Sequence, residues 1–512
     1  MHDALTPAPD AAARDFLARP LDALLQPGET SDGSTEALAL FHAVAPGVPA
    51  YRSLLAEEKI DPASIKTAAD FARLPLLDKK NYNHRFSLDE LVLGGKLTRC
   101  DFFAVSSGST GEPTFWPRAQ ADEFPVAVRF EQVFRDAFRA HEKRTLAVIC
   151  FALGTWVGGM FTASCMRHLS AKGYPVVTAT PGNKIDKILR VVQRLAPQFE
   201  QTVLLGYPPF LKEVVDAGRS QGIDWSPFKV KLVMAGEVFS ETWRDLVAER
   251  LGVDDPLRFG ASIYGTADAG VLGQETPLSI AIRRFLAEHP EAAQAMFGDT
   301  RLPTLCQYDP TARYFESLPI DGGGGDGGGG SLAFSGWNGV PLVRYHIADR
   351  GGVLAYDAML AKMRDLGCDP VETVRESGGP EPRRQPFVWV FGRTDFTVSF
   401  FGANVFPETI SLGLEQPEIR TRVTGKFVMQ VKEGLVGDKP RLTIAVELAK
   451  DASGDDTFAE AVAGAILAQL LRLNSEFANY VPAAFQNPLV TLYPAGNSDY
   501  FPIGVKHRYS RK

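Results

Sequence analysis

Residues 106–114 have the residue types that a phosphate-binding loop needs. The stretch reads Ser-Ser-Gly-Ser-Thr-Gly-Glu-Pro-Thr and follows a strand-like run from Cys100 to Val105. Glycines let the backbone turn tightly and present its N–H groups, while hydroxyls add uncharged donors for phosphate oxygens. A solvated linker has a similar composition, and the Gly-Lys-Ser/Thr of a Walker loop is missing. The stretch therefore predicts a polyphosphate site only if further motifs follow it.

Further motifs with acidic, aromatic and basic side chains do follow. They are Gly236-Glu237, Tyr264–Asp268, Pro341–Asp349, Phe391–Phe396 with Gly402–Pro407, and Pro502–Arg508. The carboxylate of Asp268 could bind a hard cation through oxygen, and that of Asp349 could accept two hydrogen bonds. Each has a plainer interpretation, because a strand-end aspartate often closes a turn and a basic tail is often only solvated. For the tail, Lys439 and Lys512 compete with Lys506 as the lysine of interest.

The elements that must position these motifs alternate between short apolar runs and helical patterns. We expect strands at 146–153, 174–178, 202–205, 229–234 and 257–259, with helices at 184–195, 209–221 and 240–251. Such alternation predicts an α/β fold with mainly parallel sheets flanked by helices on both faces. Ligands of these sheets bind at the carboxyl ends of the strands, where the loop at 106–114 should lie.

The pattern changes near residue 395. Runs at 426–431 and 441–448 predict paired strands, an apolar stripe from Phe458 to Leu473 predicts a helix, and 489–492 predict a further strand. We therefore expect a large N-terminal domain, 1–394, and a small, mobile α+β domain, 395–512. Residues 322–330 are almost all glycine and predict a surface loop.

Composition excludes several classes of protein. A net charge of −7 over 512 residues argues against a nucleic-acid partner. Five scattered cysteines suggest neither a zinc site nor disulfides and fit the cytoplasm, as does an N-terminus without a signal-peptide pattern. The uncharged stretch 146–166 is long enough for a membrane span, but its glycines and hydroxyls favour a buried strand and helix. The oligomeric state stays open, with a homodimer as one alternative.

Taken together, the motifs resemble those of the adenylate-forming (acyl-CoA synthetase) superfamily, in particular its phenylacetate–CoA ligase branch. The resemblance covers nearly the whole chain and is most specific in 106–114 and in Gly402–Pro407. Ala267 and Asp268 replace a hydroxyl residue and a glutamate of the family, and Glu112 stands where a lysine is common. We consider that Arg118 supplies the missing positive charge.

The resemblance implies a role for each motif. Catalytic roles fall to Lys506, Arg393 and Asp395, with Lys506 as the adenylation lysine and Asp395 as the hinge; Asp268 would hold Mg²⁺. The nucleotide-binding residues would be Ser106, Ser107, Gly108, Ser109, Thr110, Gly111, Gly236, Glu237, Tyr264, Gly265, Thr266, Asp349 and Arg393. The acyl pocket would include Trp156, Val157, Gly260, Ala261 and Ile263.

The implied reaction uses ATP, Mg²⁺ and coenzyme A. An aromatic or apolar carboxylic acid would form acyl-AMP and pyrophosphate, and the thiol of coenzyme A would then displace AMP. Two alternatives stay open: transfer of the acyl group to a protein thiol or an amine, and a nucleotide-binding protein that has lost catalysis.

Overall fold

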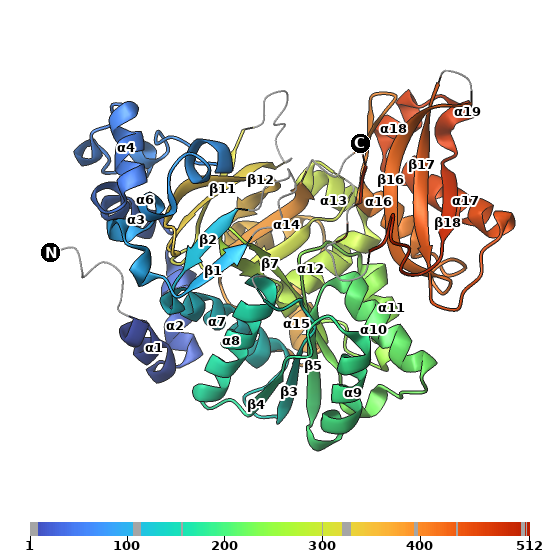
Figure 1. The fold of residues 1–512 in the computed structure, drawn as a ribbon, viewed down its shortest axis with the longest axis horizontal. Coiled ribbons are helices and arrows are strands. Elements are labelled where there is room, and N and C mark those ends of the chain that lie inside the picture. The colour runs from blue at the N-terminus through green and yellow to red at the C-terminus, as the bar shows by residue number, and fades with distance from the viewer. Residues whose placement is uncertain are drawn as a thin grey trace.

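A computed structural model describes residues 9–105, 114–154, 157–299, 301–319, 329–393, 398–436, 439–502, 507 and 509–511. Its centre is an 11-stranded mixed sheet with the order β10-β11-β12-β13-β9-β8-β7-β6-β5-β3-β4. Helices cover both faces of this sheet, and a smaller C-terminal sheet lies beside it (Figure 1).

One part of the large sheet is parallel, as predicted. Its strands and the helices that connect them are β3 (Thr145–Ile149), α8 (Val157–Ala171), β4 (Val176–Ala179), α9 (Ile185–Leu195), β5 (Gln201–Gly206), α10 (Pro208–Ser220), β6 (Lys231–Ala235), α11 (Glu241–Leu251) and β7 (Gly260–Thr266). Strands β3 and β5 are buried at every position, which explains why they read as continuous apolar runs. The strand expected at 257–259 instead begins at Gly260, because its glycines weaken the strand signal.

The remainder of the sheet is antiparallel, so the expectation of a mainly parallel sheet holds for only part of it. From β7 onward every pairing is antiparallel. The elements here are β8 (Gly270–Gln274), α12 (Pro277–Glu288), α13 (Pro290–Phe297), β9 (Thr304–Gln307), β10 (Tyr314–Leu318), β11 (Gly330–Gly336), β12 (Leu342–Leu354), α14 (Tyr356–Asp365), α15 (Pro370–Glu376) and β13 (Phe387–Arg393). Gly330 is buried at the start of β11 rather than in a surface loop, while residues 320–328 lie outside the described residues.

Short helices and one hairpin precede the parallel strands. They are α1 (Pro9–Ala18), α2 (Leu21–Thr30), α3 (Ser34–Gly47), α4 (Pro49–Glu57), α5 (Ala68–Phe71), α6 (Leu88–Leu91), β1 (Phe102–Val105), β2 (Phe115–Arg118) and α7 (Glu123–Gln132). Helices α3 and α4 bury Phe41, Val44 and Tyr51 against the antiparallel strands. This packing brings the N-terminal segment close to the antiparallel strands of the large sheet.

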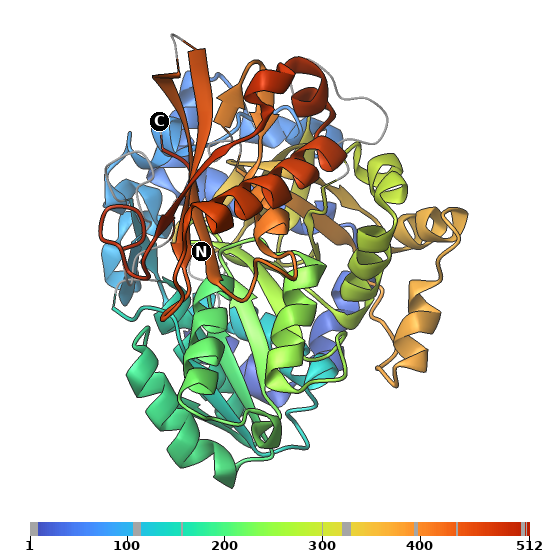
Figure 2. The ribbon, with the colours of Figure 1, turned by 90° about the vertical axis from the view of Figure 1, so that its right-hand side faces the viewer.

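The C-terminal segment has its own sheet and its own apolar core. Its elements are β14 (Val398–Phe400), β15 (Ala403–Val405), α16 (Pro407–Leu414), β16 (Val423–Val436), β17 (Lys439–Leu448), α17 (Asp456–Leu473), α18 (Ser475–Tyr480), α19 (Ala483–Gln486) and β18 (Leu489–Tyr493). The predicted strands, helix and final strand are all present, and their apolar side chains form one cluster. In the view of Figure 2 this unit, in orange and red, lies in front of the upper part of the large domain.

The prediction that 146–166 forms a buried strand and helix is confirmed in outline by β3 and α8. Within the described part of the chain, no helix combines the length and the apolar character that a membrane crossing requires. All five cysteines are free thiols, in agreement with their scattered spacing.

Candidate active site

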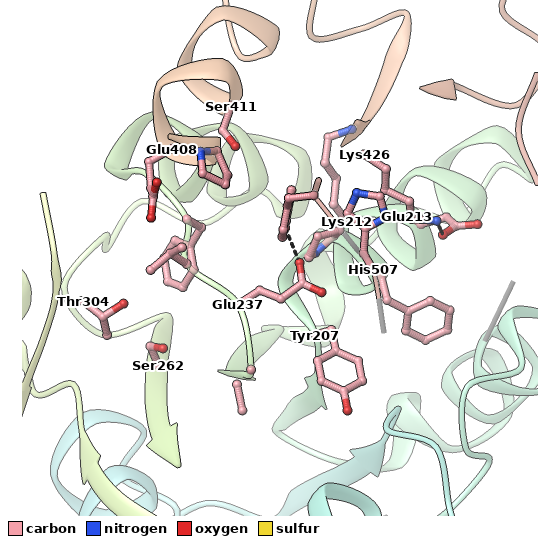
Figure 3. A pocket seen from close by; sticks show the side chains of 18 of the residues that line it. Tyr207, Lys212, Glu213, Glu237, Ser262, Thr304, Glu408, Ser411, Lys426 and His507 are labelled. Carbon is pink, nitrogen blue, oxygen red and sulfur yellow. Dashed lines mark hydrogen bonds and ion pairs between the residues drawn. The ribbon is translucent and has the colours of Figure 1, made fainter. Parts of the chain in front are cut away.

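A cleft of about 1940 Å³ lies between the large sheet and the C-terminal unit. Phe151, Tyr207 and Gly236, which follow the carboxyl ends of β3, β5 and β6, line it from one side. Glu408, Lys426 and other residues of the C-terminal unit line it from the other side (Figure 3). The cleft therefore occupies the edge at which parallel sheets bind ligands, and it exceeds the volume of about 300–1,000 Å³ that is usual for one small ligand.

Two predicted nucleotide-binding residues are bonded to each other in this cleft. The hydroxyl of Tyr264, at the end of β7, donates to Asp349 Oδ2 at 2.8 Å. The Tyr264 ring stacks on Phe315, with ring centroids 6.5 Å apart. In the pairing of β12 with β13, Asp349 lies directly opposite Arg393, whose side chain is outside the described residues. The cleft thus brings together Tyr264 and Asp349, and strand pairing places the backbone of Arg393 next to Asp349.

The turn from Thr266 to Ala269 holds the predicted metal ligand. Thr266 Oγ1 accepts a hydrogen bond from the backbone N–H of Ala269 at 3.1 Å and closes the turn. A Cβ at Gly265 would lie 2.7 Å from the carbonyl oxygen of Gly270, so the tight β7–β8 hairpin requires glycine there. The Asp268 side chain is only 4% exposed, and its Oδ2 accepts a bond from the Tyr345 hydroxyl at 2.8 Å. A carboxylate held in this way has a fixed direction toward the cleft that it lines.

Lys79 is a charged residue of the site that the sequence did not reveal. Its ammonium lies 3.3 Å from Asp268 Oδ1, and it lines the same cleft. Leu77 positions it by pairing with β12: the N–H of Leu77 donates to the carbonyl of Arg344, and that of His346 donates to the carbonyl of Leu77. The sequence around Lys79 carries no local signal of this role, because the pairing joins segments far apart in the chain.

Arg118, the predicted source of charge for the phosphate loop, is bonded to the turn that holds Asp268, while loop residues 106–113 lie outside the described part of the chain. Its side chain is buried, and its Nη2 donates to the carbonyl oxygens of Ala267 and Asp268 at 2.5 and 2.8 Å. Arg118 therefore supports the Asp268 turn from behind. Burial lowers the pKa of this guanidinium, partly offset by the nearby carboxylates of Asp122 and Asp268.

The Gly236-Glu237 turn forms another wall of the cleft. Gly236 has a φ of +86°, and a Cβ there would lie 2.8 Å from the Tyr207 ring, so this position requires glycine. Glu237 accepts a hydrogen bond from the hydroxyl of Tyr509, which belongs to the C-terminal tail. Figure 3 shows Glu237 between Tyr207 of the large domain and His507 of the tail.

An apolar wall adjoins this turn. It includes Val126, Phe130, Phe151, Phe161, Val233, Ile263 and Val271. Ile263, which the sequence assigns to the acyl pocket, is thus among the residues that line the cleft. Gly260 and Ala261 do not line the cleft, because they lie at the beginning of β7, away from the carboxyl end of the strand.

Several predicted residues lie outside the described part of the chain. These are Ser106, Ser107, Gly108, Ser109, Thr110, Gly111, Trp156, Asp395 and Lys506, together with the side chain of Val157. Neighbours on both sides are described: His84 Nε2 lies 2.9 Å from Thr114 Oγ1, just after the predicted phosphate loop. Pro502 and His507, which bracket the segment of Lys506, both line the cleft.

The donors in the cleft fit Mg²⁺ bound together with a nucleotide. Mg²⁺ in such sites takes one or two carboxylates and completes its shell with phosphate oxygens and water. Asp268 offers one carboxylate, and the described residues contain no cluster of three or more metal-binding side chains. The protein would therefore hold the ion through Asp268 and depend on the phosphates for the rest.

Comparisons with known proteins agree with this geometry, although no family model matches the chain. A phenylacetate-coenzyme A ligase of Thermus thermophilus is 23% identical over 419 residues, which cover 77% of this chain and 81% of that ligase. A phenylacetate-coenzyme A ligase of Aromatoleum evansii is 24% identical over 225 residues, 43% of this chain and 47% of that ligase, or about half its length.

Solved structures extend the likeness to the whole fold. The crystal structure of 2-hydroxyisobutyryl-CoA ligase in the postadenylation state, in complex with R3-HIB-AMP, gives a TM-score of 0.65 at 15% identity and covers 93% of this chain and 88% of that chain. The chain has the acyl-CoA ligase fold. In the thioesterification state, with 2-HIB-AMP and CoA, the same ligase gives a TM-score of 0.52 at 15% identity, over 96% of this chain and 91% of that chain. The predicted resemblance to phenylacetate–CoA ligases is thereby confirmed.

Proposed function

We propose that this acyl-CoA ligase homologue activates a carboxylic acid with ATP, forming acyl-AMP and pyrophosphate, and then transfers the acyl group to coenzyme A. The observation that carries the proposal is the meeting of Tyr264, Asp349, Asp268 and the Gly236 turn in one cleft. These residues come from motifs far apart in the chain, and each has the chemistry that one part of an adenylate requires. The relatives are named as ligases that join an acid to coenzyme A, which is the reaction class proposed here.

Asp349 is suited to hold the ribose. A carboxylate has about four acceptor sites, so the bond from Tyr264 leaves capacity for the two ribose hydroxyls. The Tyr264 bond also fixes the direction of the carboxylate before the nucleotide arrives. Arg393, whose backbone pairs with that of Asp349, would act on the same part of the nucleotide.

Charge near the phosphates would come from several groups. Residues 106–111 would cradle the phosphates, Lys79 would offset their charge from beside Asp268, and Lys506 would approach between the α-phosphate and the acid. Mg²⁺, held by Asp268, supplies further neutralisation of the phosphates when bound. With charge offset in this way, the acid carboxylate can attack the α-phosphate, and no covalent intermediate with the protein is needed.

The apolar wall indicates an aromatic or aliphatic acid. Phe130, Phe151 and Phe161 line the cleft together with Gly158, which lies beside the Phe151 ring. Burying an apolar body there contributes about 25 cal/mol per Å² of apolar area. The carboxylate of such an acid would then point toward Gly236 and the nucleotide.

The C-terminal unit is proposed as a lid that begins at residue 395 and reorients at Asp395 between the two half-reactions. Such a movement would withdraw Lys506 after acyl-AMP forms and admit the thiol. A cytoplasmic location is a further prediction from the sequence, and a homodimer is one alternative for the assembly.

Pyrophosphate release with Mg·ATP tests the proposal. A panel of aromatic and aliphatic acids is assayed with and without coenzyme A, with Lys506→Ala as the control. Acid-dependent release that collapses in Lys506→Ala supports adenylation, and an acyl-CoA product identifies the acceptor. Acyl-AMP that accumulates without acyl-CoA indicates a protein thiol or an amine as the acceptor, while ATP binding without release indicates a protein that has lost catalysis.

A further inference from the structure

The C-terminal tail is fastened to the lid strand β16. The backbone N–H of Met429 donates to the carbonyl of Tyr509 at 2.7 Å, and the N–H of Arg511 donates to the carbonyl of Met429 at 2.9 Å. His507 Nε2 donates to the carbonyl of Phe427 at 2.6 Å. Burial lowers the pKa of His507 to about 4, so the ring is neutral and keeps a single donor for this bond. The tail therefore moves together with the lid.

One side chain of the tail reaches across to the large domain. The Tyr509 ring packs on Phe427, with centroids 5.1 Å apart, and its hydroxyl donates to the carboxylate of Glu237. Burial raises the pKa of Tyr509 well above its ordinary value, and Glu237 raises it further, so the hydroxyl stays protonated and remains a donor. A bond from O–H to a carboxylate at a buried site is about twice as strong as one between neutral groups.

Other contacts between the lid and the large domain are made by residues outside the Gly236-Glu237 turn, at α10, at the exposed edge of α11 and between Ser240 and Glu415. Lys426 Nζ lies 3.0 Å from Glu213 Oε2, and Lys212 Nζ donates to the carbonyl of Val423 at 3.2 Å, both at α10. Arg420 lies 3.5 Å from Glu249 at the exposed edge of α11. These contacts dock the body of the lid, whereas Tyr509 bonds to the residue directly after Gly236.

We propose that Tyr509 is a positioning residue for acyl-AMP formation, holding the tail that carries Lys506 against the Gly236-Glu237 turn. This inference rests on the proposed function. Lys506 precedes Tyr509 by three residues, a span of at most about 11 Å of extended chain, so fixing Tyr509 limits where the lysine can go.

The bond to Glu237 must break if the lid reorients for the second half-reaction. Tyr509 should therefore matter for acyl-AMP formation and not for thioester formation from acyl-AMP that is already made. A residue with a merely structural role would affect both half-reactions alike.

The test measures each half-reaction separately in Tyr509→Phe. Acyl-AMP formation is followed by pyrophosphate release, and thioester formation is followed from synthetic acyl-AMP and coenzyme A. We expect acyl-AMP formation to fall by at least about tenfold, as the loss of a hydrogen bond to a charged group predicts, while thioester formation changes by less than about twofold. Glu237→Gln keeps an acceptor oxygen and should retain more of the first half-reaction than Glu237→Ala.

Arg420→Ala is the matched control, because it removes a contact across the same interface at an exposed position. It should leave both half-reactions within about twofold of the unaltered protein. Normal acyl-AMP formation by Tyr509→Phe, or an equal loss of both half-reactions, overturns the inference. If the unaltered protein forms no acyl-AMP with any acid, the proposed function itself is overturned. This outcome differs from both results that overturn only the inference about Tyr509.

Discussion

The ammonium of Lys79 lies 3.3 Å from Asp268 Oδ1, at a point where two segments from opposite parts of the fold meet. Lys79 follows Leu77, which pairs with β12, while Asp268 follows the end of β7. The Lys79 side chain is 30% exposed and Asp268 only 4%, so the cation faces the cleft and the carboxylate supports it from the wall. A polyphosphate bound there would meet the positive charge of Lys79.

Lys79→Met should weaken the use of Mg·ATP. Removing a cation that offsets phosphate charge is expected to lower kcat/KM for ATP by about ten- to a hundredfold, or roughly 1.5–3 kcal/mol. The measurement is initial-rate pyrophosphate release over a range of ATP concentrations. Lys80→Met is the control, because Lys80 is exposed and adjacent. Equal kinetics for the two variants would contradict the role assigned to Lys79.

Tyr264→Phe should impair nucleotide binding while leaving the fold intact. The variant keeps the ring that stacks on Phe315 but loses the donor to Asp349. We expect KM for ATP to rise by about tenfold with a smaller change in kcat, since the orientation of Asp349 is no longer fixed. Isothermal titration with a non-hydrolysable ATP analogue measures the same loss directly.

Tyr82→Phe provides the comparison for Tyr264→Phe. The hydroxyl of Tyr82 is buried and has no hydrogen-bond partner among the described residues. Its removal should leave ATP kinetics unchanged and raise the free energy of unfolding by about 1 kcal/mol, because an unpaired buried hydroxyl is costly. If Tyr82→Phe loses as much activity as Tyr264→Phe, the loss in Tyr264→Phe no longer shows that the bond from Tyr264 orients Asp349.

Gly236→Ala should disrupt the wall between the nucleotide and the acid. The φ of +86° disfavours any residue with a Cβ by about 1–2 kcal/mol, and the new methyl group would press on the Tyr207 ring. We expect at least a tenfold fall, about 1.4 kcal/mol, in kcat/KM for the acid. Gly464→Ala is the control: it lies in α17 with open space around it, and should stabilise the protein by about 0.5–1 kcal/mol.

Local motifs and local periodicity were predictable from the sequence, and contacts between distant segments were not. The strands and helices of the parallel part and of the C-terminal unit were predicted within a few residues, because each has a clear apolar pattern. Lys79 was missed because only its pairing with β12 places it in the cleft. The bond of Arg118 to the carbonyl of Ala267 was likewise not predictable, because it joins segments about 150 residues apart.

The antiparallel part of the sheet was also missed, for a related reason. Strands such as β12 and β13 pair in antiparallel fashion across a long connection that contains α14 and α15. Neither these strands nor the helices between them were predicted from the sequence, so the direction in which they pair was not inferred. Gly260 and Ala261 were assigned to the acyl pocket from family position, which did not reveal where β7 begins.

Glu415 should make lid docking depend on pH. It is buried beside Ser240, whose hydroxyl donates to it, and burial raises its pKa from 4.5 to about 7. The docked protein therefore binds a proton more tightly than the unfolded chain, so this contribution to stability is complete below pH 4.5 and is lost as the pH rises to about 7. Above pH 7, ionised Glu415 therefore lowers the free energy of unfolding by about 3 kcal/mol.

Glu415→Gln isolates this effect. At each pH we compare the melting temperatures of Glu415→Gln and of the unaltered protein. We expect the difference, variant minus unaltered, to be larger at pH 8 than at pH 5. The pH dependence of the unaltered protein alone would not isolate Glu415, because His507 also titrates. The pKa of His507 is lowered from 6.5 to about 4, so its contribution to stability is lost as the pH falls, opposite to that of Glu415. A difference between the two proteins that stays constant across this range would contradict the burial of an ionisable Glu415 in the docked lid.

The most direct test of adenylation follows the oxygen atoms of the acid. A carboxylic acid that supports pyrophosphate release is labelled with heavy oxygen in its carboxylate, and AMP is isolated after one round of acyl-CoA formation. Attack of the carboxylate on the α-phosphate transfers one labelled oxygen to AMP, which mass spectrometry detects as the predicted result. Unlabelled AMP, or label in inorganic phosphate released together with ADP, would contradict an acyl-AMP intermediate.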